Sequence, residues 1–120
     1  MKYLIVDDDL FMTTLVSSIL KKHKVQVVSH FNMGDALRSL AEDDYDGIIM
    51  DLHMPGLDGI SAIPLARQIR PEISIGLMTS DATPGIKSRA LLSGADFFLQ
   101  KPADLADLWK IIEGCRQKEL

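Results

Sequence analysis

Polar side chains capable of chemistry stand where four apolar runs of this chain end. They are Asp7, Asp8, Asp51, Thr79 and Lys101. In a parallel α/β sheet the carboxyl ends of the strands lie at one edge, and ligands bind at that edge. Three carboxylates, one hydroxyl and one ammonium group would then share a small pocket. Such a set suits a hard divalent cation, which prefers oxygen ligands, together with a phosphoryl group.

The chemistry of such a pocket follows from its charges. Neighbouring carboxylates resist joint ionisation unless a cation offsets them, and Mg²⁺ does so with oxygen ligands in octahedral geometry. No cluster of histidine and cysteine competes for a softer metal. Asp51 stands alone after its run, where a carboxylate can attack phosphorus and form an aspartyl phosphate. Lys101 would neutralise one phosphoryl oxygen and Thr79 would donate a hydrogen bond to another.

The segments that must position these residues alternate between two patterns. Continuous apolar runs, typical of strands buried on both faces, occupy residues 3–6, 25–28, 47–50, 73–78 and 97–99. The segments between them have apolar residues at helical spacing. These stripes are Met12, Leu15, Val16, Ile19 and Leu20; Met33, Ala36, Leu37, Leu40 and Ala41; Ala62, Leu65, Ala66 and Ile69; and Leu105, Leu108, Trp109 and Ile112.

Residues typical of helix ends indicate where several of these helices start and stop. Asn32 is expected to cap the second helix and Asp104 to open the fifth. The fourth helix has weak periodicity, but Thr83-Pro84 is a suitable start and Gly94 a suitable stop. Pro64 falls inside the third helix, where a proline removes a backbone donor, so a kink or a late helix start is predicted.

Strand and helix thus alternate five times, and such connections are nearly always right-handed crossovers onto a parallel sheet. We therefore predict one doubly wound α/β domain of (βα)5 type over residues 1–120, with a five-stranded parallel sheet. Residues 115–120 lose the apolar pattern and become charged. This segment is either a natural end or the beginning of a linker.

Composition limits the classes of function. A length of 120 residues fits one domain with its own core, and the single cysteine excludes an internal disulfide. A formal net charge of −4 without a basic block argues against direct nucleic-acid binding. No apolar stretch reaches the roughly 18 residues of a membrane span, and the amino-terminal run leads into aspartates, unlike a signal peptide. We expect a cytoplasmic protein that does not bind membranes.

Each polar residue also has a purely structural interpretation. Asp8 or Asp9 could cap the first helix, where carboxylates favour the helix dipole. Asp51 could be a turn residue, Thr79 a strand-end hydroxyl and Lys101 a solvated side chain. Their joint placement at four strand ends favours the functional interpretation.

These residues resemble the receiver domains of two-component response regulators. The matching segments are LIVDDD (4–9), IMDLHMPGLDG (49–59), LMTS (77–80), SGAD (93–96) and KP (101–102). They match in order and spacing over essentially the whole chain. The resemblance implies a flavodoxin-like fold with strand order 2-1-3-4-5.

The resemblance also implies a role for each acid. Asp51 would accept a phosphoryl group from a histidine kinase or a histidine phosphotransfer protein. Mg²⁺ would be held by Asp8 directly, by Asp7 through water, by Asp51 and by the backbone carbonyl of His53. The side chain of His53, together with Asp81, would control access of the hydrolysing water.

The remaining implied roles concern phosphoryl binding and the conformational change that follows it. Thr79 and Lys101 would bind the phosphoryl oxygens, and the Lys101–Pro102 peptide would be cis. In receivers the threonine moves toward the phosphoryl group while an aromatic residue three before the lysine turns inward. Here that residue is Phe98, which lacks the hydroxyl of the tyrosine often found there, so packing alone must couple site and surface and the coupling should be looser. Ala103 likewise replaces a common phenylalanine, which removes a packing anchor.

The leading hypothesis is a phosphoryl-accepting switch that acts only on itself, by Mg²⁺-dependent self-phosphorylation and self-dephosphorylation. Its output would be a surface of the fourth helix, fifth strand and fifth helix that binds a downstream protein or effector domain. The protein itself would be a monomer or a phosphorylation-dependent dimer. An interaction module independent of phosphorylation usually lacks an acid or the lysine, and none is missing. A small-molecule phosphotransferase would need a substrate-binding insert and a second base near Asp51. A flavin or nucleotide site would need a glycine-rich phosphate loop.

Overall fold

The computed structural model describes residues 1–118. Its strands are β1 (Lys2–Val6), β2 (Gln26–His30), β3 (Gly47–Asp51), β4 (Ser74–Thr79) and β5 (Phe97–Gln100). Its helices are α1 (Leu10–Lys22), α2 (Met33–Glu42), α3 (Gly59–Ile69), α4 (Ile86–Leu92), a 3-10 helix η1 (Ala103–Asp107) and α5 (Leu108–Lys118). Within these residues, every helix is too short or too polar to cross a bilayer.

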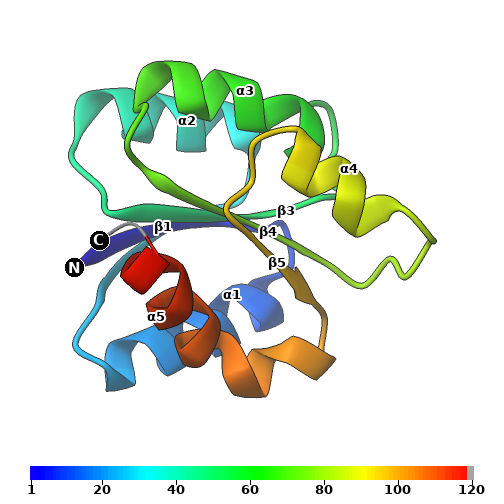
Figure 1. Ribbon diagram of the computed structural model, residues 1–120. Helices are drawn as coiled ribbons and strands as arrows, with labels where there is room; N and C mark the ends of the chain where they lie inside the picture. Colours follow the sequence, from blue (N-terminus) through cyan, green and yellow to red (C-terminus); the bar gives the residue numbers. More distant parts are fainter. Residues whose placement is uncertain (119–120) are drawn as a thin grey trace.

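The strands form one parallel sheet in the order β2-β1-β3-β4-β5. Helices α2, α3 and α4 cover one face, and α1 and α5 cover the other (Figure 1). This arrangement is the flavodoxin-like α/β fold, so the predicted fold class and strand order are confirmed. All strands run in one direction, and the carboxyl ends of β1, β3, β4 and β5 therefore lie at the same edge.

The sheet separates two apolar cores. One lies under α2, α3 and α4 and includes Leu4, Val6, Ile48 and Met50. The other lies under α1 and α5 and includes Tyr3, Ile5, Ile49 and Leu99. Alternate residues of β1 and β3 thus enter opposite cores, which explains why the sequences of these strands are continuously apolar.

Side-chain caps fix the starts of α1 and α2. The Asp9 carboxylate accepts hydrogen bonds from the amides of Phe11 and Met12, at 3.0 and 3.4 Å, so Asp9 caps α1. The Asn32 side chain accepts one from the Asp35 amide at 2.8 Å, which confirms the predicted cap of α2. Both caps satisfy amides that have no partner within the helix.

The predicted start of the fourth helix is wrong. Thr83-Pro84 precedes α4, which begins at Ile86 after Gly85 in a left-handed conformation (φ 89°). The Asp81 carboxylate accepts a hydrogen bond from the Thr83 amide at 2.8 Å, and this contact holds the segment as a turn instead. The stop is near the expected place, because Gly94 adopts φ 113° just beyond the last turn.

The fifth helix also starts later than predicted. Asp104 lies in the 3-10 helix η1, and its carboxylate accepts a hydrogen bond from the Gln100 amide at 2.7 Å. Helix α5 begins at Leu108 and continues through Lys118, so residues 115–118 of the predicted linker are helical, and residues 119–120 lie outside the described residues.

Pro64 does not delay the third helix. Helix α3 begins at Gly59, because the Asp58 carboxylate caps it by accepting a hydrogen bond from the Ser61 amide at 2.7 Å. The expected late start is therefore wrong, and Pro64 lies within the helix.

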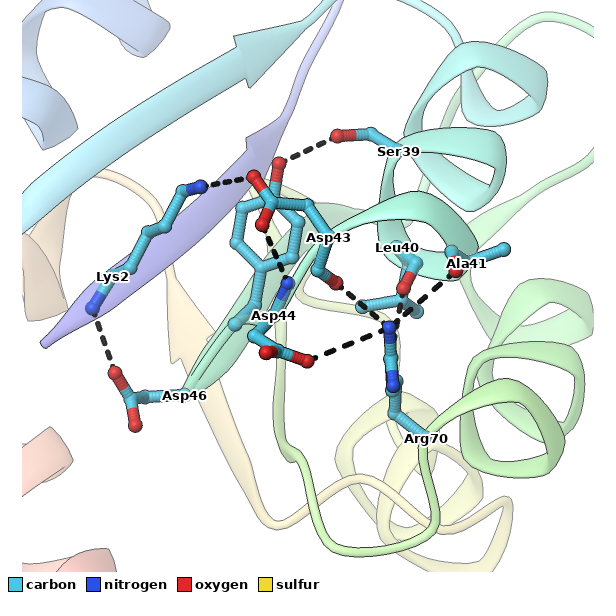
Figure 2. Close-up of polar contacts among 9 residues, drawn as sticks. Lys2, Ser39, Leu40, Ala41, Asp43, Asp44, Asp46 and Arg70 are labelled. Atoms are coloured by element: carbon cyan, nitrogen blue, oxygen red, sulfur yellow. Dashed lines mark hydrogen bonds and ion pairs between the residues drawn. The ribbon is translucent and has the colours of Figure 1, made fainter.

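Near the amino ends of the strands, away from Asp7 and Asp51, polar side chains join the end of α2 to β1 and to the residue after α3 (Figure 2). Arg70 follows α3 and donates to the carbonyl oxygens of Leu40 and Asp43 at 3.0 Å each, and to that of Ala41 at 3.4 Å. The Lys2 ammonium pairs with the Asp43 carboxylate. The Arg70 contacts satisfy backbone carbonyls that the end of α2 leaves without helical partners.

Candidate functional site

The acids predicted to share a pocket do lie together. Oxygens of Asp7, Asp8 and Asp51 fall within 4.8 Å of one another, at the ends of β1 and β3. Asp7 is 0% exposed and Asp51 is 7% exposed, whereas Asp8 faces solvent. Only one carboxylate of the three is therefore hydrated as an ordinary surface acid would be.

The buried acid Asp7 is held through both of its oxygens. Its Oδ1 accepts a hydrogen bond from the Asp9 amide at 2.9 Å, and its Oδ2 accepts one from Lys101 Nζ at 3.0 Å. These bonds fix the orientation of the carboxylate and occupy one lone pair on each of its oxygens.

Lys101 connects the acids of two strands. Its Nζ lies 3.0 Å from Asp7 Oδ2 and 3.4 Å from Asp51 Oδ2, and its side chain is 10% exposed. The Lys101 amide donates to the Thr79 carbonyl at 2.7 Å, and the Lys101–Pro102 peptide bond is cis. One ammonium group thus serves two buried carboxylates and cannot balance all the negative charge of the site.

Burial and the neighbouring charge both act on the Asp51 carboxyl group. Burial, and after it the charge of Asp7, raise the pKa of Asp51 to about 6, although Lys101 acts in the opposite direction. A cation beside Asp51 would favour the ionised carboxylate. The atoms that could ligate a metal here are carboxylate oxygens, and two of the carboxylates are almost dehydrated. This donor set fits Mg²⁺.

Thr79, Asp81 and His53 form a chain of contacts beside the acids. Buried Thr79 accepts a hydrogen bond from the Asp81 amide through Oγ1 at 3.0 Å. The Asp81 carboxylate lies 2.9 Å from His53 Nε2. Hydrogen bonds from Thr83, followed by that from His53, lower the pKa of Asp81 to about 2. The loops that follow β3 and β4 are therefore joined across the edge of the site.

The two residues at which this chain departs from the receiver pattern lie near the end of β5. Phe98 is half-buried and packs against the core under α2, α3 and α4. Ala103 is exposed at the start of η1. The inward turn of Phe98 and its looser coupling stay predictions.

Sequence reasoning missed two residues that shape this edge. Thr13 on α1 donates through Oγ1 to the Asp9 carbonyl at 3.0 Å, and Asp104 binds the Gln100 amide. Thr13 carries no recognisable signal, because it lies among the apolar residues of its helix. Asp104 directly precedes the apolar stripe that begins at Leu105, and we interpreted it as a helix start.

Gly59 makes the close approach of α3 to Asp51 possible. A Cβ at this position would lie 2.7 Å from the Asp51 carbonyl oxygen and 2.5 Å from Leu77 Cδ1. Gly59→Ala should therefore displace the strand end and reduce the free energy of unfolding by about 2 kcal/mol, as measured by urea denaturation. Gly114→Ala is the matched control, because nothing lies within 4 Å of its added Cβ. Equal stability of the two variants would contradict the close approach.

Comparison with known proteins places the chain among signalling domains. It is 32% identical over 117 residues to the hybrid signal transduction histidine kinase M of Dictyostelium discoideum, covering 92% of this chain and 5% of the kinase. It is 30% identical to the transcriptional regulatory protein PrrA of Mycobacterium tuberculosis, covering 89% of this chain and 46% of PrrA. The chain thus spans less than half the length of these curated relatives.

Solved structures share the fold. A CheY-like receiver domain of Methanospirillum hungatei superimposes with a TM-score of 0.87 at 26% identity, covering 98% of this chain and 95% of that one. A Burkholderia pseudomallei response regulator, which contains a phosphorylated aspartic acid and a calcium ion, gives 0.83 at 24% identity, covering 92% and 65%. TrrA of Thermotoga maritima, solved with Mg²⁺ and beryllium fluoride, gives 0.85 at 22% identity, covering 95% and 97%.

The family model for the response regulator receiver domain matches residues 3–113. That range contains the acids, the threonine and the lysine of the site. Receivers are signalling domains rather than classical enzymes. The chain therefore belongs to the response regulator receiver domains, the aspartyl-phosphorylated domains of two-component systems.

Proposed function

We propose that Asp51 accepts a phosphoryl group from a phosphohistidine, supplied by a histidine kinase or a histidine phosphotransfer protein. The observation that supports this proposal is the gathering of Asp7, Asp8 and Asp51 within 4.8 Å, with the Lys101 ammonium 3.4 Å from Asp51. A nucleophile, a cation site and a fixed positive charge are then available at one edge of the sheet.

The chain's own ligands for Mg²⁺ would be the carboxylates of Asp8 and Asp51 and the backbone carbonyl of His53. Asp7 would act through water, as the resemblance to receivers implies, while its two oxygens keep their hydrogen bonds to the Asp9 amide and Lys101. When bound, the metal offsets the negative charge of the acids and of the phosphoryl oxygens. The similar protein TrrA was solved with Mg²⁺, which supports the choice of this ion.

In the transfer, a carboxylate oxygen of Asp51 forms a bond to phosphorus as the bond between phosphorus and the imidazole nitrogen breaks. The products are an aspartyl phosphate and a histidine that takes up a proton. Lys101 neutralises a phosphoryl oxygen. The Thr79 hydroxyl accepts a hydrogen bond from the Asp81 amide through its oxygen, and its own hydrogen is available to donate to a second phosphoryl oxygen. His53 and Asp81, joined at 2.9 Å, limit the approach of the water that ends the signal.

The consequence of phosphorylation would be a changed binding surface. Thr79 would move toward the phosphoryl group and Phe98 would turn inward, which alters the face formed by α4, β5 and α5. A downstream protein or effector domain would read that face. We keep as predictions a single receiver domain over residues 1–120, a monomer or phosphorylation-dependent dimer, and a place in the cytoplasm.

Acetyl phosphate tests this function without a cognate kinase. In the presence of Mg²⁺ the protein should gain the mass of one phosphoryl group, and Asp51→Asn should gain none, as measured by intact mass spectrometry. Asp107→Asn, an exposed acid on η1, is the matched control and should be modified like the wild type. An unmodified wild type would favour the interaction module that acts without phosphorylation.

A further inference from the structure

The outer edge of β5 has one backbone amide with an unusual partner. β5 is the last strand of the sheet, so amides that point away from β4 have no strand to bind. The Lys101 amide points toward β4 and donates to the Thr79 carbonyl at 2.7 Å. Amides alternate in direction along a strand, and the Gln100 amide therefore points outward. There it donates to Asp104 Oδ2 at 2.7 Å.

This contact does not serve α5. Helix α5 begins at Leu108. Among residues 1–118 the Asp104 carboxylate accepts its hydrogen bond from the Gln100 amide and none from the first turn of α5. The carboxylate instead reaches back across Pro102 to the strand end. Leu105 also donates its amide to the Pro102 carbonyl at 3.1 Å, so η1 closes a compact turn around Lys101-Pro102.

The strand end held in this way carries Lys101. Two amides on opposite edges of the backbone, those of Gln100 and Lys101, are both bound at 2.7 Å. The side chain that follows must place its ammonium 3.0 Å from Asp7 and 3.4 Å from Asp51. A shift of the backbone would lengthen one of these contacts. A charged acceptor gives a stronger hydrogen bond than a neutral one and resists such a shift better.

We propose that Asp104 is a positioning residue for phosphoryl transfer: its carboxylate, bound to the Gln100 amide, fixes the end of β5 and so keeps the Lys101 ammonium between Asp7 and Asp51. This inference rests on the proposed function of Asp51. Asp104 contacts no reacting atom and acts through Lys101.

The test compares phosphorylation rates with acetyl phosphate and Mg²⁺, normalised to the folded fraction measured by circular dichroism. Asp104→Ala should lower the rate about tenfold, since a displacement of about 1 Å at a catalytic group can reduce a rate by one to two orders of magnitude. Asp104→Asn should keep most of the rate, because its amide oxygen can still accept from Gln100. Asp107→Ala, on the same 3-10 helix, should not change the rate.

A double-mutant cycle separates positioning from a structural role. With Lys101→Met already present, adding Asp104→Ala should lower the rate no further, because the residue through which Asp104 acts is gone. An undiminished rate in Asp104→Ala, or an equal loss with and without Lys101, would overturn the inference. A Gln100 amide that exchanges with solvent as fast as exposed loop amides in the wild type would also overturn it, whether or not the variants fold. A wild type that is not phosphorylated would instead remove the proposed function itself.

Discussion

Lys101→Met should lower the free energy of unfolding of the metal-free protein by about 3 kcal/mol at neutral pH. The ammonium lies 3.0 Å from Asp7 Oδ2 and 3.4 Å from Asp51 Oδ2, and all three side chains are at most 10% exposed. Methionine keeps much of the apolar stem but removes the charge. Two buried carboxylates then lose their shared partner while remaining away from water. Urea denaturation in the presence of a chelator measures the change.

Two further variants show whether the effect comes from the buried charges. Lys110→Met removes an exposed lysine of α5 and should change the free energy of unfolding by less than about 0.5 kcal/mol. Asp51→Asn combined with Lys101→Met should recover part of the loss, because one carboxylate fewer is left without a cation. Equal effects of Lys101→Met and Lys110→Met would contradict the role assigned to the ammonium.

Much of the fold could be predicted because its strands are buried on both faces. Ile5 and Val6 enter opposite cores, as do Ile48 and Ile49, so the runs are continuously apolar and easily recognised. The order of the strands had no such signal. An apolar run indicates burial, but it does not identify the neighbouring strand, and the order 2-1-3-4-5 came from the resemblance to receivers.

Helix starts after β4 and β5 could not be predicted from periodicity, because side chains of the preceding turns decide them. Asp81 binds the Thr83 amide, and Gly85 adopts a left-handed conformation before α4. Asp104 binds backward to Gln100 and leaves a 3-10 helix before α5. Each of these contacts competes with a helix cap that the same residue types would otherwise form.

The members of the site could be predicted from the strand ends, but their electrostatics could not. The sequence pattern does not indicate which of the adjacent acids Asp7 and Asp8 is buried. In the structure Asp7 is fully buried and Asp8 is exposed. Lys101 lies nearer to Asp7 than to the proposed acceptor Asp51, at 3.0 and 3.4 Å. Burial and distance of this kind arise only when the strands pack together.

Asp51→Asn should stabilise the metal-free protein at neutral pH by about 2 kcal/mol. Burial, with a smaller contribution from the charge of Asp7, raises the pKa of Asp51 to about 6. Near pH 7 folding must therefore dehydrate an ionised carboxylate next to another one. Asparagine has nearly the same size and no charge, so the variant folds without this cost. Loss of the phosphoryl acceptor and gain of stability are thus expected from one substitution.

The pH dependence identifies the cause of that gain. A carboxyl group with a higher pKa in the folded than in the unfolded chain binds its proton more tightly when folded. Its contribution to wild-type stability is therefore largest below the unfolded-state pKa of about 4 and is lost as pH rises through about 6. The difference between Asp51→Asn and wild type should accordingly be small near pH 4 and reach its full value above pH 6. Added Mg²⁺ should stabilise the wild type more than the variant, which lacks one proposed ligand. A difference that does not vary with pH, or equal stabilisation of both proteins by Mg²⁺, would contradict the buried charge and the metal site respectively.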